Sequence, residues 1–252
     1  GLDHQRAKWG KLASTYIMMG EKCAVKHADE IIVLSKGVQD YFREKYGRET
    51  RFIPNGVNRP VIREANIIKY KFGLEKDDYI LYLGRLVPEK GLRYLVEAFK
   101  NVNTNKKLVI AGGSSDTDEF ANEIKAMAKE DDRIIFTGFV QGEELYELYS
   151  NAYVYTLPSD LEGMPLSLLE AMSYGNCVIG SDIAEIADVV EDKAVLFRKS
   201  DVGNLTEKLQ MVCDDQELVQ KYKSEAADYI CNKYDWDDVV DRTLKLYRKG
   251  RR

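Results

Sequence analysis

From Tyr79 onward, short apolar runs alternate with longer segments of helical periodicity, and this alternation constrains the fold more than any other feature of the chain. The runs are continuously apolar, which indicates strands that are buried on both faces. We expect strands at residues 79–83, 107–111, 133–137, 152–157, 176–180 and 194–197. Helices are expected at residues 91–102, 118–129, 143–150, 166–174, 183–190, 202–213, 216–233 and 236–249. The pattern predicts an α/β fold with a parallel sheet sandwiched between helices.

The amino-terminal part of the chain supplies fewer strands. We expect a helix over residues 4–27, a strand at 30–35, a helix at 38–46, a strand at 50–54, a linker at 58–62 and a short helix at 66–72. The turn signal Pro54-Asn55-Gly56 separates the second strand from the linker.

Composition excludes several classes of function. A net charge of −5 and an isoelectric point near 5.3 argue against nucleic acid as a partner. No apolar run approaches the roughly 18–20 residues that span a bilayer. The four cysteines form no C-x-x-C pair, which favours free thiols and a cytoplasmic location over disulfides or a zinc site.

Residues 157–172 combine two acidic side chains with a predicted helix start. Glu162 is expected on the loop after an apolar strand, Pro165 at the first helical position, and Glu170 further into the helix, pointing back toward the loop. Gly163, Met164, Leu166 and Ser167 leave N–H groups that suit a phosphate. Because carboxylates accept hydrogen bonds from hydroxyls, this arrangement is what a sugar nucleotide needs. The alternative is a surface loop with two solvated acids.

Residues 84–91, Gly-Arg-Leu-Val-Pro-Glu-Lys-Gly, follow the first of the alternating strands. Gly84 permits close approach of a ligand to the backbone. Arg85 offers a planar fork suited to phosphate and Lys90 a compact positive charge. We expect both to converge with the amides near Met164 on one diphosphate. The alternative is a loop with exposed basic residues.

Taken in order, these motifs resemble the carboxyl-terminal, donor-binding half of the family 4 retaining glycosyltransferases, which have the GT-B fold. The matching segments are residues 52–57, 84–91, 109–113, 136–140, 158–159 and 162–172. The resemblance extends from about Ala28 to the end of the chain. It implies a Rossmann-like parallel sheet and a nucleotide-diphosphate sugar as donor.

The resemblance also implies roles for matched positions. Arg85 and Lys90 would hold the donor diphosphate, and Glu170 would accept hydrogen bonds from ribose hydroxyls. Glu162 would bind the transferred sugar beside the backbone of Gly163, Met164, Pro165 and Leu166. Gly84, Gly112 and Gly113 would line the cleft, with Val140 beside the base. Asn55, where the domains meet, would have a structural role.

The residue types suit this chemistry. Cleavage of a sugar–diphosphate bond develops negative charge on the leaving oxygen, which Arg85, Lys90 and a helix N-terminus would stabilise. Glu162 could act as a nucleophile in a double displacement, but the resemblance favours sugar positioning and front-face transfer. With two cations at the diphosphate, we expect no metal and no other cofactor. Asp116-Thr117-Asp118 resembles a metal-binding D-x-D, but before a helix Asp is a common N-cap.

The resemblance divides the chain at residues 58 and 234. Residues 1–58 would be the remnant of an acceptor-binding domain, 59–234 the donor-binding domain, and 235–252 a helix returning to the first domain. The chain begins at Gly1 without Met, and the small number of strands before residue 58 predicts an incomplete first domain with an exposed sheet edge and apolar faces. We expect residues 1–54 to be either loosely ordered or buried against another copy of the chain.

Two functions remain open at this point. The first is the donor-binding part of an enzyme that builds a polysaccharide or glycolipid on a sugar or lipid-linked acceptor. The alternative is a nucleotide-sugar-binding module without catalysis. The basic residues after Leu244 (Lys245, Arg248, Lys249, Arg251 and Arg252) suit a helix C-terminus, and also peripheral contact with anionic lipid at the inner membrane face.

Overall fold

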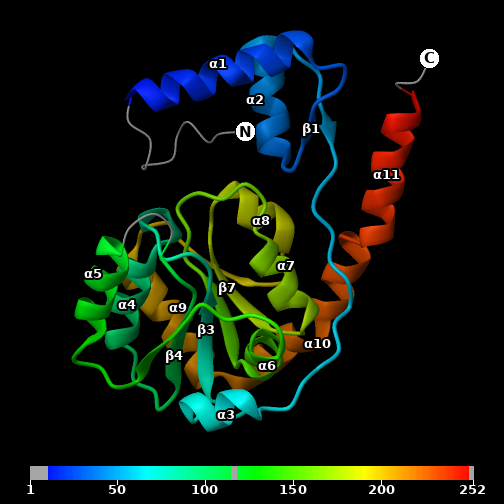
Figure 1. Cartoon of the computed structure of the whole chain (residues 1–252). Helices are drawn as coiled ribbons and strands as arrows, with labels where there is room; N and C mark the ends of the chain where they lie inside the picture. Colours follow the sequence, from blue (N-terminus) through cyan, green and yellow to red (C-terminus); the bar gives the residue numbers. More distant parts are fainter. Residues whose placement is uncertain (1–10, 115–117, 250–252) are drawn as a thin grey trace.

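The computed structural model describes residues 11–114 and 118–249, and within them a six-stranded parallel sheet forms the centre of the carboxyl-terminal part (Figure 1). Its strands are β3 (Tyr79–Leu83), β4 (Lys107–Ala111), β5 (Ile134–Gly138), β6 (Val154–Leu157), β7 (Cys177–Ser181) and β8 (Val195–Phe197). Their order across the sheet is β5-β4-β3-β6-β7-β8. The prediction of an α/β fold with a parallel sheet is confirmed, with strand ends within two residues of those expected.

Helices cover both faces of this sheet. One layer consists of α4 (Leu92–Lys100), α5 (Glu119–Ala128) and α9 (Val202–Asp214). The other consists of α3 (Ile67–Phe72), α6 (Glu143–Asn151), α7 (Leu166–Ser173), α8 (Ala184–Val190) and α10 (Gln216–Lys233). Neighbouring residues of β3 serve opposite layers: Tyr79 and Leu81 pack into one core, Ile80 and Tyr82 into the other, all fully buried. This burial explains the continuously apolar runs in the sequence.

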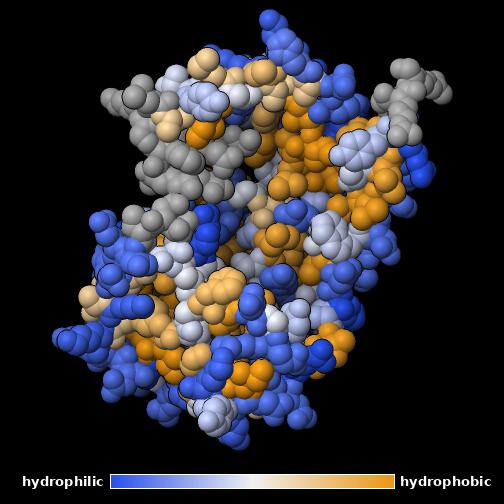
Figure 2. Space-filling model, in the orientation of Figure 1, coloured by the Kyte–Doolittle hydropathy of each residue, from blue (hydrophilic) through white to orange (hydrophobic). Residues whose placement is uncertain are grey.

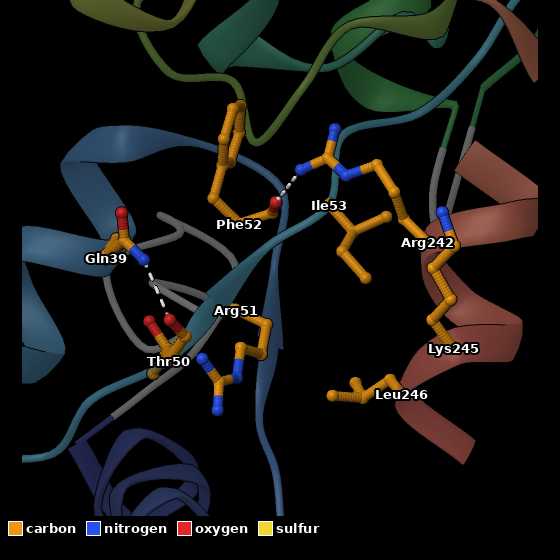
Figure 3. A pocket seen from close by; sticks show the side chains of 8 residues that line it. All are labelled: Gln39, Thr50, Arg51, Phe52, Ile53, Arg242, Lys245 and Leu246. Carbon is orange, nitrogen blue, oxygen red and sulfur yellow. Dashed lines mark hydrogen bonds between the residues drawn. The ribbon is translucent and has the colours of Figure 1, made fainter. Parts of the chain in front are cut away.

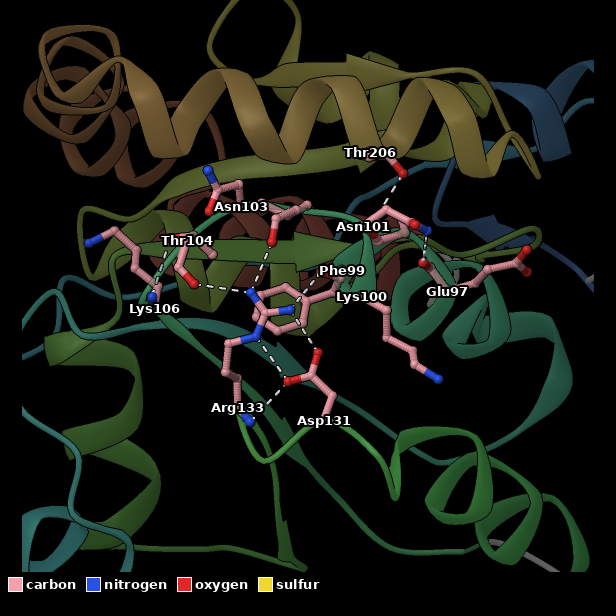
Figure 4. A network of polar contacts seen from close by, with 12 residues as sticks. Glu97, Phe99, Lys100, Asn101, Asn103, Thr104, Lys106, Asp131, Arg133 and Thr206 are labelled. Atoms are coloured by element: carbon pink, nitrogen blue, oxygen red, sulfur yellow. Dashed lines mark hydrogen bonds and ion pairs between the residues drawn. The ribbon is translucent and has the colours of Figure 1, made fainter.

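A polar network closes the end of the sheet at which β4 and β5 begin (Figure 4). The guanidinium of Arg133 donates hydrogen bonds to the carbonyl oxygens of Val102 (2.9 Å) and Thr104 (3.0 Å) and to the carboxylate of Asp131 (2.7 Å). It also lies 4.7 Å from the ring centre of Phe99. Because these contacts use the guanidinium to satisfy loop carbonyls, this network is structural and leaves the opposite end of the sheet for a ligand.

The amino-terminal region lies above the six-stranded sheet in Figure 1 and contains α1 (Lys11–His27), β1 (Ile32–Val33), α2 (Lys36–Tyr46) and β2 (Arg51–Phe52). The two strands pair in parallel and are shorter than expected, because each finds a partner over only two residues. The buried carboxylate of Glu21 ties α1 to α2 by accepting hydrogen bonds from Tyr41 (2.7 Å) and Tyr46 (2.6 Å). Residues 4–10 of the expected first helix lie outside the described residues.

The start of α2 also differs from the expectation. Ser35 Oγ accepts a hydrogen bond from the N–H of Val38 at 3.2 Å, so Ser35 is the N-cap and the helix begins at Lys36. Gly47, with φ of 61°, ends the helix.

Several contacts join the amino-terminal region to the rest of the chain. The last helix, α11 (Trp236–Lys249), runs up beside the amino-terminal region (Figure 1). A Cβ at Gly56 would lie 2.5 Å from the Trp236 ring, and Arg242 donates to the carbonyl oxygen of Phe52. Residues 58–66 contain neither helix nor strand. None of the helices in the described part of the chain is both long and apolar enough to cross a membrane.

Candidate functional site

The strand order reverses direction between β3 and β6. From β3 the chain adds β4 and then β5 on one side, and it then crosses to place β6 on the other side. Loops that leave neighbouring strands in opposite directions open a crevice at the carboxyl ends, where α/β folds bind their ligands. The loops that follow β3 and β6 here are residues 84–91 and 158–165, which hold most of the predicted site residues.

These two loops are in direct contact. Gly91 has φ of 70°, and a Cβ on it would lie 1.9 Å from the carbonyl oxygen of Pro158. The N–H of Asp160 donates to the carbonyl oxygen of Glu89 at 2.9 Å, and Tyr94 Oη donates to the Asp160 carboxylate at 2.5 Å. Only glycine satisfies both the backbone conformation and the close approach at position 91.

An ion pair spans the same loops. Lys90 Nζ lies 2.6 Å from Glu162 Oε1, and Ser159 Oγ donates to the same oxygen at 2.6 Å. The side chains of Lys90 and Glu162 are 16% and 7% exposed. The sequence predicted that Lys90 contacts the diphosphate and Glu162 the sugar, whereas in the structure these two side chains are paired with each other. Their pairing spares either charge from being buried alone.

The N-terminus of α7 supplies unpaired amides. The helix begins at Leu166, so Pro165 lies at the N-cap and not at the first helical position as expected. The carbonyl oxygen of Pro165 accepts the N–H groups of Leu168 (3.1 Å) and Leu169 (3.3 Å). Within the described residues, the N–H groups of the four residues predicted to bind phosphate donate no hydrogen bond. These four are Gly163, Met164, Leu166 and Ser167.

Glu170 lies in the middle of α7, half-buried. Tyr149 Oη, from α6, donates a hydrogen bond to Glu170 Oε2 at 3.0 Å and fixes that carboxylate. Burial raises the pKa of Glu170 above the ordinary glutamate value, and the tyrosine hydrogen bond offsets part of that increase. Nearer the N-terminus of α7, Tyr155 Oη donates a hydrogen bond to Ser167 Oγ at 2.8 Å and so links β6 to the first turn of this helix.

A pocket of about 330 Å³ lies at the carboxyl ends of β3, β4 and β5. It is lined by Leu83, Gly84, Arg85, Gly112, Gly113, Ser114, Phe139 and Val140. Gly112 has φ of 144°, and a Cβ there would lie 1.9 Å from the carbonyl oxygen of Gly84. Glycine at 112 therefore lets the two loops meet. Five of the predicted site residues, from three separate loops, come together around this one cavity.

A second pocket, of about 190 Å³, includes Gly163 and Met164. Its other walls come from the start of α2, the segment around Pro54, α8, and the junction of α10 and α11. Arg85 does not line it, so Arg85 and Met164, which were expected to converge on one diphosphate, lie at two separate pockets. Met164 is nearly buried, and its Sδ accepts the N–H of Asn55 at 3.1 Å, consistent with a structural role for Asn55.

A third pocket, of about 380 Å³, lies between β2 and α11 (Figure 3). It contains none of the predicted donor residues. Arg51 pairs with Glu30 at 3.1 Å, and Arg242 binds the carbonyl oxygen of Phe52. Of these two guanidinium groups, that of Arg242 joins α11 to β2, whereas that of Arg51 is paired within the amino-terminal region.

The D-x-D segment falls partly outside the described residues, since Asp116 and Thr117 are not described. Asp118 occupies the N-cap position of α5, but its backbone is helical and its side chain makes no capping hydrogen bond. It accepts a hydrogen bond from Ser114 Oγ instead. Asp118 therefore stands at the expected N-cap position but does not cap α5 through its side chain.

The sequence did not predict the contacts of three residues near the site. Ser159 holds Glu162, Tyr149 holds Glu170, and Phe139 lines the Arg85 pocket. The tyrosine is indistinguishable in sequence from a core aromatic. Ser159 and Phe139 lie inside the matched motifs, so the sequence predicted that they are near the site but not which residues they contact.

Comparison with known proteins agrees with this fold. Residues 64–229 match the family "Glycosyl transferases group 1", and residues 1–58 match a domain of unknown function, DUF1972. Because the first match covers more than half of the chain, the protein belongs to the group 1 glycosyl transferases.

Individual relatives are distant. The chain is 26% identical over 94% of its length to an uncharacterized glycosyltransferase of Methanocaldococcus jannaschii, and 25% identical over 91% to the alpha-maltose-1-phosphate synthase of Mycolicibacterium smegmatis. It spans 62% and 65% of those two proteins, less than two thirds of their length.

Among solved structures, a sucrose-phosphate synthase from Thermosynechococcus elongatus aligns with a TM-score of 0.84 and 26% identity, covering 98% of this chain and 65% of that one. Anabaena HepE, solved in complex with UDP-glucose, aligns with a TM-score of 0.85 and 17% identity, covering 93% of this chain and 68% of its own. The fold is that of the GT-B glycosyltransferases.

Proposed function

We propose that this chain binds a nucleotide-diphosphate sugar and supplies the donor half of a glycosyltransferase that retains the anomeric configuration. The acceptor would be a sugar or a lipid-linked sugar in polysaccharide or glycolipid synthesis. The observation that carries the proposal is the pocket shared by Gly84, Arg85, Gly112, Gly113 and Val140 at the reversal of strand order. Anabaena HepE binds UDP-glucose on the same fold.

The diphosphate would lie between Arg85 and the N-terminus of α7. Arg85 is exposed and lines the pocket, where its guanidinium would bind the diphosphate, while the four unpaired amides at α7 add partial positive charge. Lys90 would leave Glu162 and turn to the diphosphate when the donor enters. Because Glu162 would then lose its counter-charge, the hydroxyls of the transferred sugar, together with Ser159, would have to donate to its carboxylate in place of Lys90.

In the transfer step, the bond between the anomeric carbon and the diphosphate oxygen breaks and a bond to the acceptor hydroxyl forms on the same face. The acceptor proton passes to the departing diphosphate oxygen. Arg85, Lys90 and the amides of α7 stabilise the negative charge that develops there. No metal is needed, because these groups already neutralise the diphosphate.

Glu162 is proposed to position the sugar. Its carboxylate is 7% exposed and held by Lys90 and Ser159, which suits a group that accepts sugar hydroxyls better than a free nucleophile. The stereochemistry is tested by nuclear magnetic resonance on the product of the full-length protein. An α-linked product from an α-linked donor supports retention, and a β-linked product contradicts it.

The alternative function is a non-catalytic module that binds a nucleotide sugar. Because the chain spans 62% and 65% of the two relatives named above, an experiment is needed to distinguish the enzyme from the module. Turnover of a donor panel by the full-length protein with mixed acceptors separates the two. Released nucleoside diphosphate above the rate of hydrolysis supports the enzyme. Donor binding without any release supports the module.

Contact with anionic lipid is proposed from the basic residues of α11, among which Lys245 and Arg248 are within the described side chains. Sedimentation with vesicles of neutral or anionic lipid tests it. Binding to anionic vesicles only, lost on Lys245→Gln with Arg248→Gln, supports the contact. Equal binding to both vesicle types contradicts it.

A further inference from the structure

Phe139 is the one large apolar side chain that the donor pocket leaves mostly in solvent. It is 77% exposed, although it lines the same cavity as Gly84, Arg85 and Gly113. The pocket's other large apolar side chains, Leu83 and Val140, are half-buried or buried. An aromatic ring at the mouth of a binding pocket, rather than in the core, needs a reason, because burying it would be favourable by about 1.5–3 kcal/mol.

The backbone around Phe139 fixes this exposed position. Gly138 has φ of 73°, which turns the chain at the end of β5, and the next-but-one residue, Val140, is 8% exposed and packs into the core beneath α6 and α7. With Val140 directed inward, the intervening side chain is directed outward. Phe139 Cβ lies against Gly113: a Cβ built on that glycine would be 3.9 Å away. The ring is therefore placed by its neighbours at one wall of the pocket.

The opposite end of the same pocket is cationic. Arg85 lies on the loop after β3, while Phe139 lies on the loop after β5, and β4 separates the two strands. Gly84, Gly112 and Gly113 are among the residues that line the cavity of about 330 Å³. A ligand that matches this arrangement has an anionic group at one end and a flat apolar face at the other, which describes a nucleoside diphosphate.

We propose that Phe139 stacks on the base of the bound nucleotide and contributes to donor affinity. This inference rests on the proposed function, since it assigns the base end of the same donor site. Stacking on an aromatic ring is sequence-tolerant because every base has a π face. Phe139 thus sets affinity for a base in general, while the neighbouring main-chain groups are left to distinguish one base from another.

Titration calorimetry on the whole chain tests this with UDP, GDP and a probe that lacks the base, ribose 5-diphosphate. Phe139→Ala is expected to weaken UDP and GDP binding by roughly 5- to 100-fold, in line with the effect of removing a stacking ring. Binding of ribose 5-diphosphate should change less than about twofold. Phe139→Tyr should retain the affinity, and Tyr70→Ala, which removes a 93% exposed aromatic ring on α3, should change nothing.

Fluorescence gives a second, direct readout. In Phe139→Trp, UDP should quench the added indole emission beyond the response of the natural chain, and ribose 5-diphosphate should not. Equal UDP affinity of the natural chain and Phe139→Ala, with no additional quenching, overturns the stacking while leaving donor binding intact. Failure of the natural chain to bind any nucleoside diphosphate overturns the donor site and the stacking with it.

Discussion

Lys90 Nζ and Glu162 Oε1 lie 2.6 Å apart across the loops that follow β3 and β6. The pair joins the two sequence motifs that first indicated a donor site, and it does so at the reversal of strand order. Each charge therefore has a partner before a ligand arrives. In the proposed donor complex Lys90 exchanges this partner for the diphosphate, which makes the pair an informative place to perturb.

Removing one member of the pair should destabilise the fold more than removing both charges. Lys90→Ala should lower the free energy of unfolding by about 3 kcal/mol, because it leaves the nearly buried Glu162 carboxylate without a counter-charge. Glu162→Gln alone should also destabilise the fold, and Lys90→Ala combined with Glu162→Gln should cost clearly less than the sum of these two single changes. Urea unfolding measures the natural chain, the two single variants and the double variant.

The exposed pair between Arg43 and Asp40, whose side chains are 55% and 51% exposed, is the matched control. Arg43→Ala should cost less than about 1 kcal/mol. Additive effects at Lys90 and Glu162 would show that they do not interact in solution.

Gly91 should tolerate no side chain. Gly91→Ala places a Cβ 1.9 Å from the Pro158 carbonyl oxygen at φ of 70°, so the two site loops must separate. We expect a loss of at least about 2 kcal/mol in unfolding free energy, seen as a lower melting temperature. Gly37→Ala, on α2 with nothing within 4 Å, should be neutral or stabilising. A melting temperature unchanged by Gly91→Ala would mean that the loops do not touch.

Glu170 should make stability depend on pH. Since burial raises the pKa of Glu170 in the folded chain, the folded state holds its proton to higher pH than the unfolded state does. The contribution of the Glu170 carboxyl group to folding stability is therefore fully present below the ordinary glutamate pKa. It is lost as the pH rises through the raised pKa of the folded chain. Glu170→Gln should gain stability over the natural chain between acidic and neutral pH, as measured by melting curves.

The control for that series is Glu97→Gln, which makes the same replacement at an exposed position on α4. The same carboxylate is expected to accept hydrogen bonds from ribose hydroxyls. UDP should accordingly bind more tightly than dTDP, and Glu170→Ala should remove the difference. Preference for dTDP would reject this role for Glu170.

The amino-terminal region should mediate self-association. Ile32 and Leu34 near β1 are 40% and 41% exposed, and Val240 and Leu244 on α11 are 49% and 43% exposed. Figure 2 shows hydrophobic surface gathered around β1 and α11. We expect light scattering to give a dimer, and Leu34→Lys with Leu244→Lys to give a monomer. A monomeric natural chain would contradict the prediction.

Much of this architecture could be read from local pattern. The bounds of the strands at Tyr79–Leu83 and Lys107–Ala111 were predicted to the residue. A strand that is covered by helices on both faces has a short, unbroken apolar run, which differs from the spaced apolar positions of an amphipathic helix. The short strands β1 and β2 were overestimated, since their length depends on how far a partner extends. No local pattern reports that.

The site could be predicted in position but not in contact. Arg85, Gly112 and Val140 come from different loops and do line one pocket, which follows from parallel strands ending at the same edge. That Lys90 binds Glu162, and that Tyr149 binds Glu170, depends on side-chain packing across elements. The same limitation applies to Asp118, whose side chain accepts a hydrogen bond from Ser114 and does not cap α5.

Calorimetric titration of UDP and GDP into the whole chain, with EDTA present, tests the central claim most directly. The account predicts saturable, metal-independent binding of at least one of them, weakened about tenfold or more by Arg85→Ala because a charged hydrogen-bonding partner of the diphosphate is lost. Arg51→Ala, which alters the pocket beside α11, should leave that affinity unchanged. Failure of the folded chain to bind either nucleotide, or equal affinity after Arg85→Ala, would contradict the account.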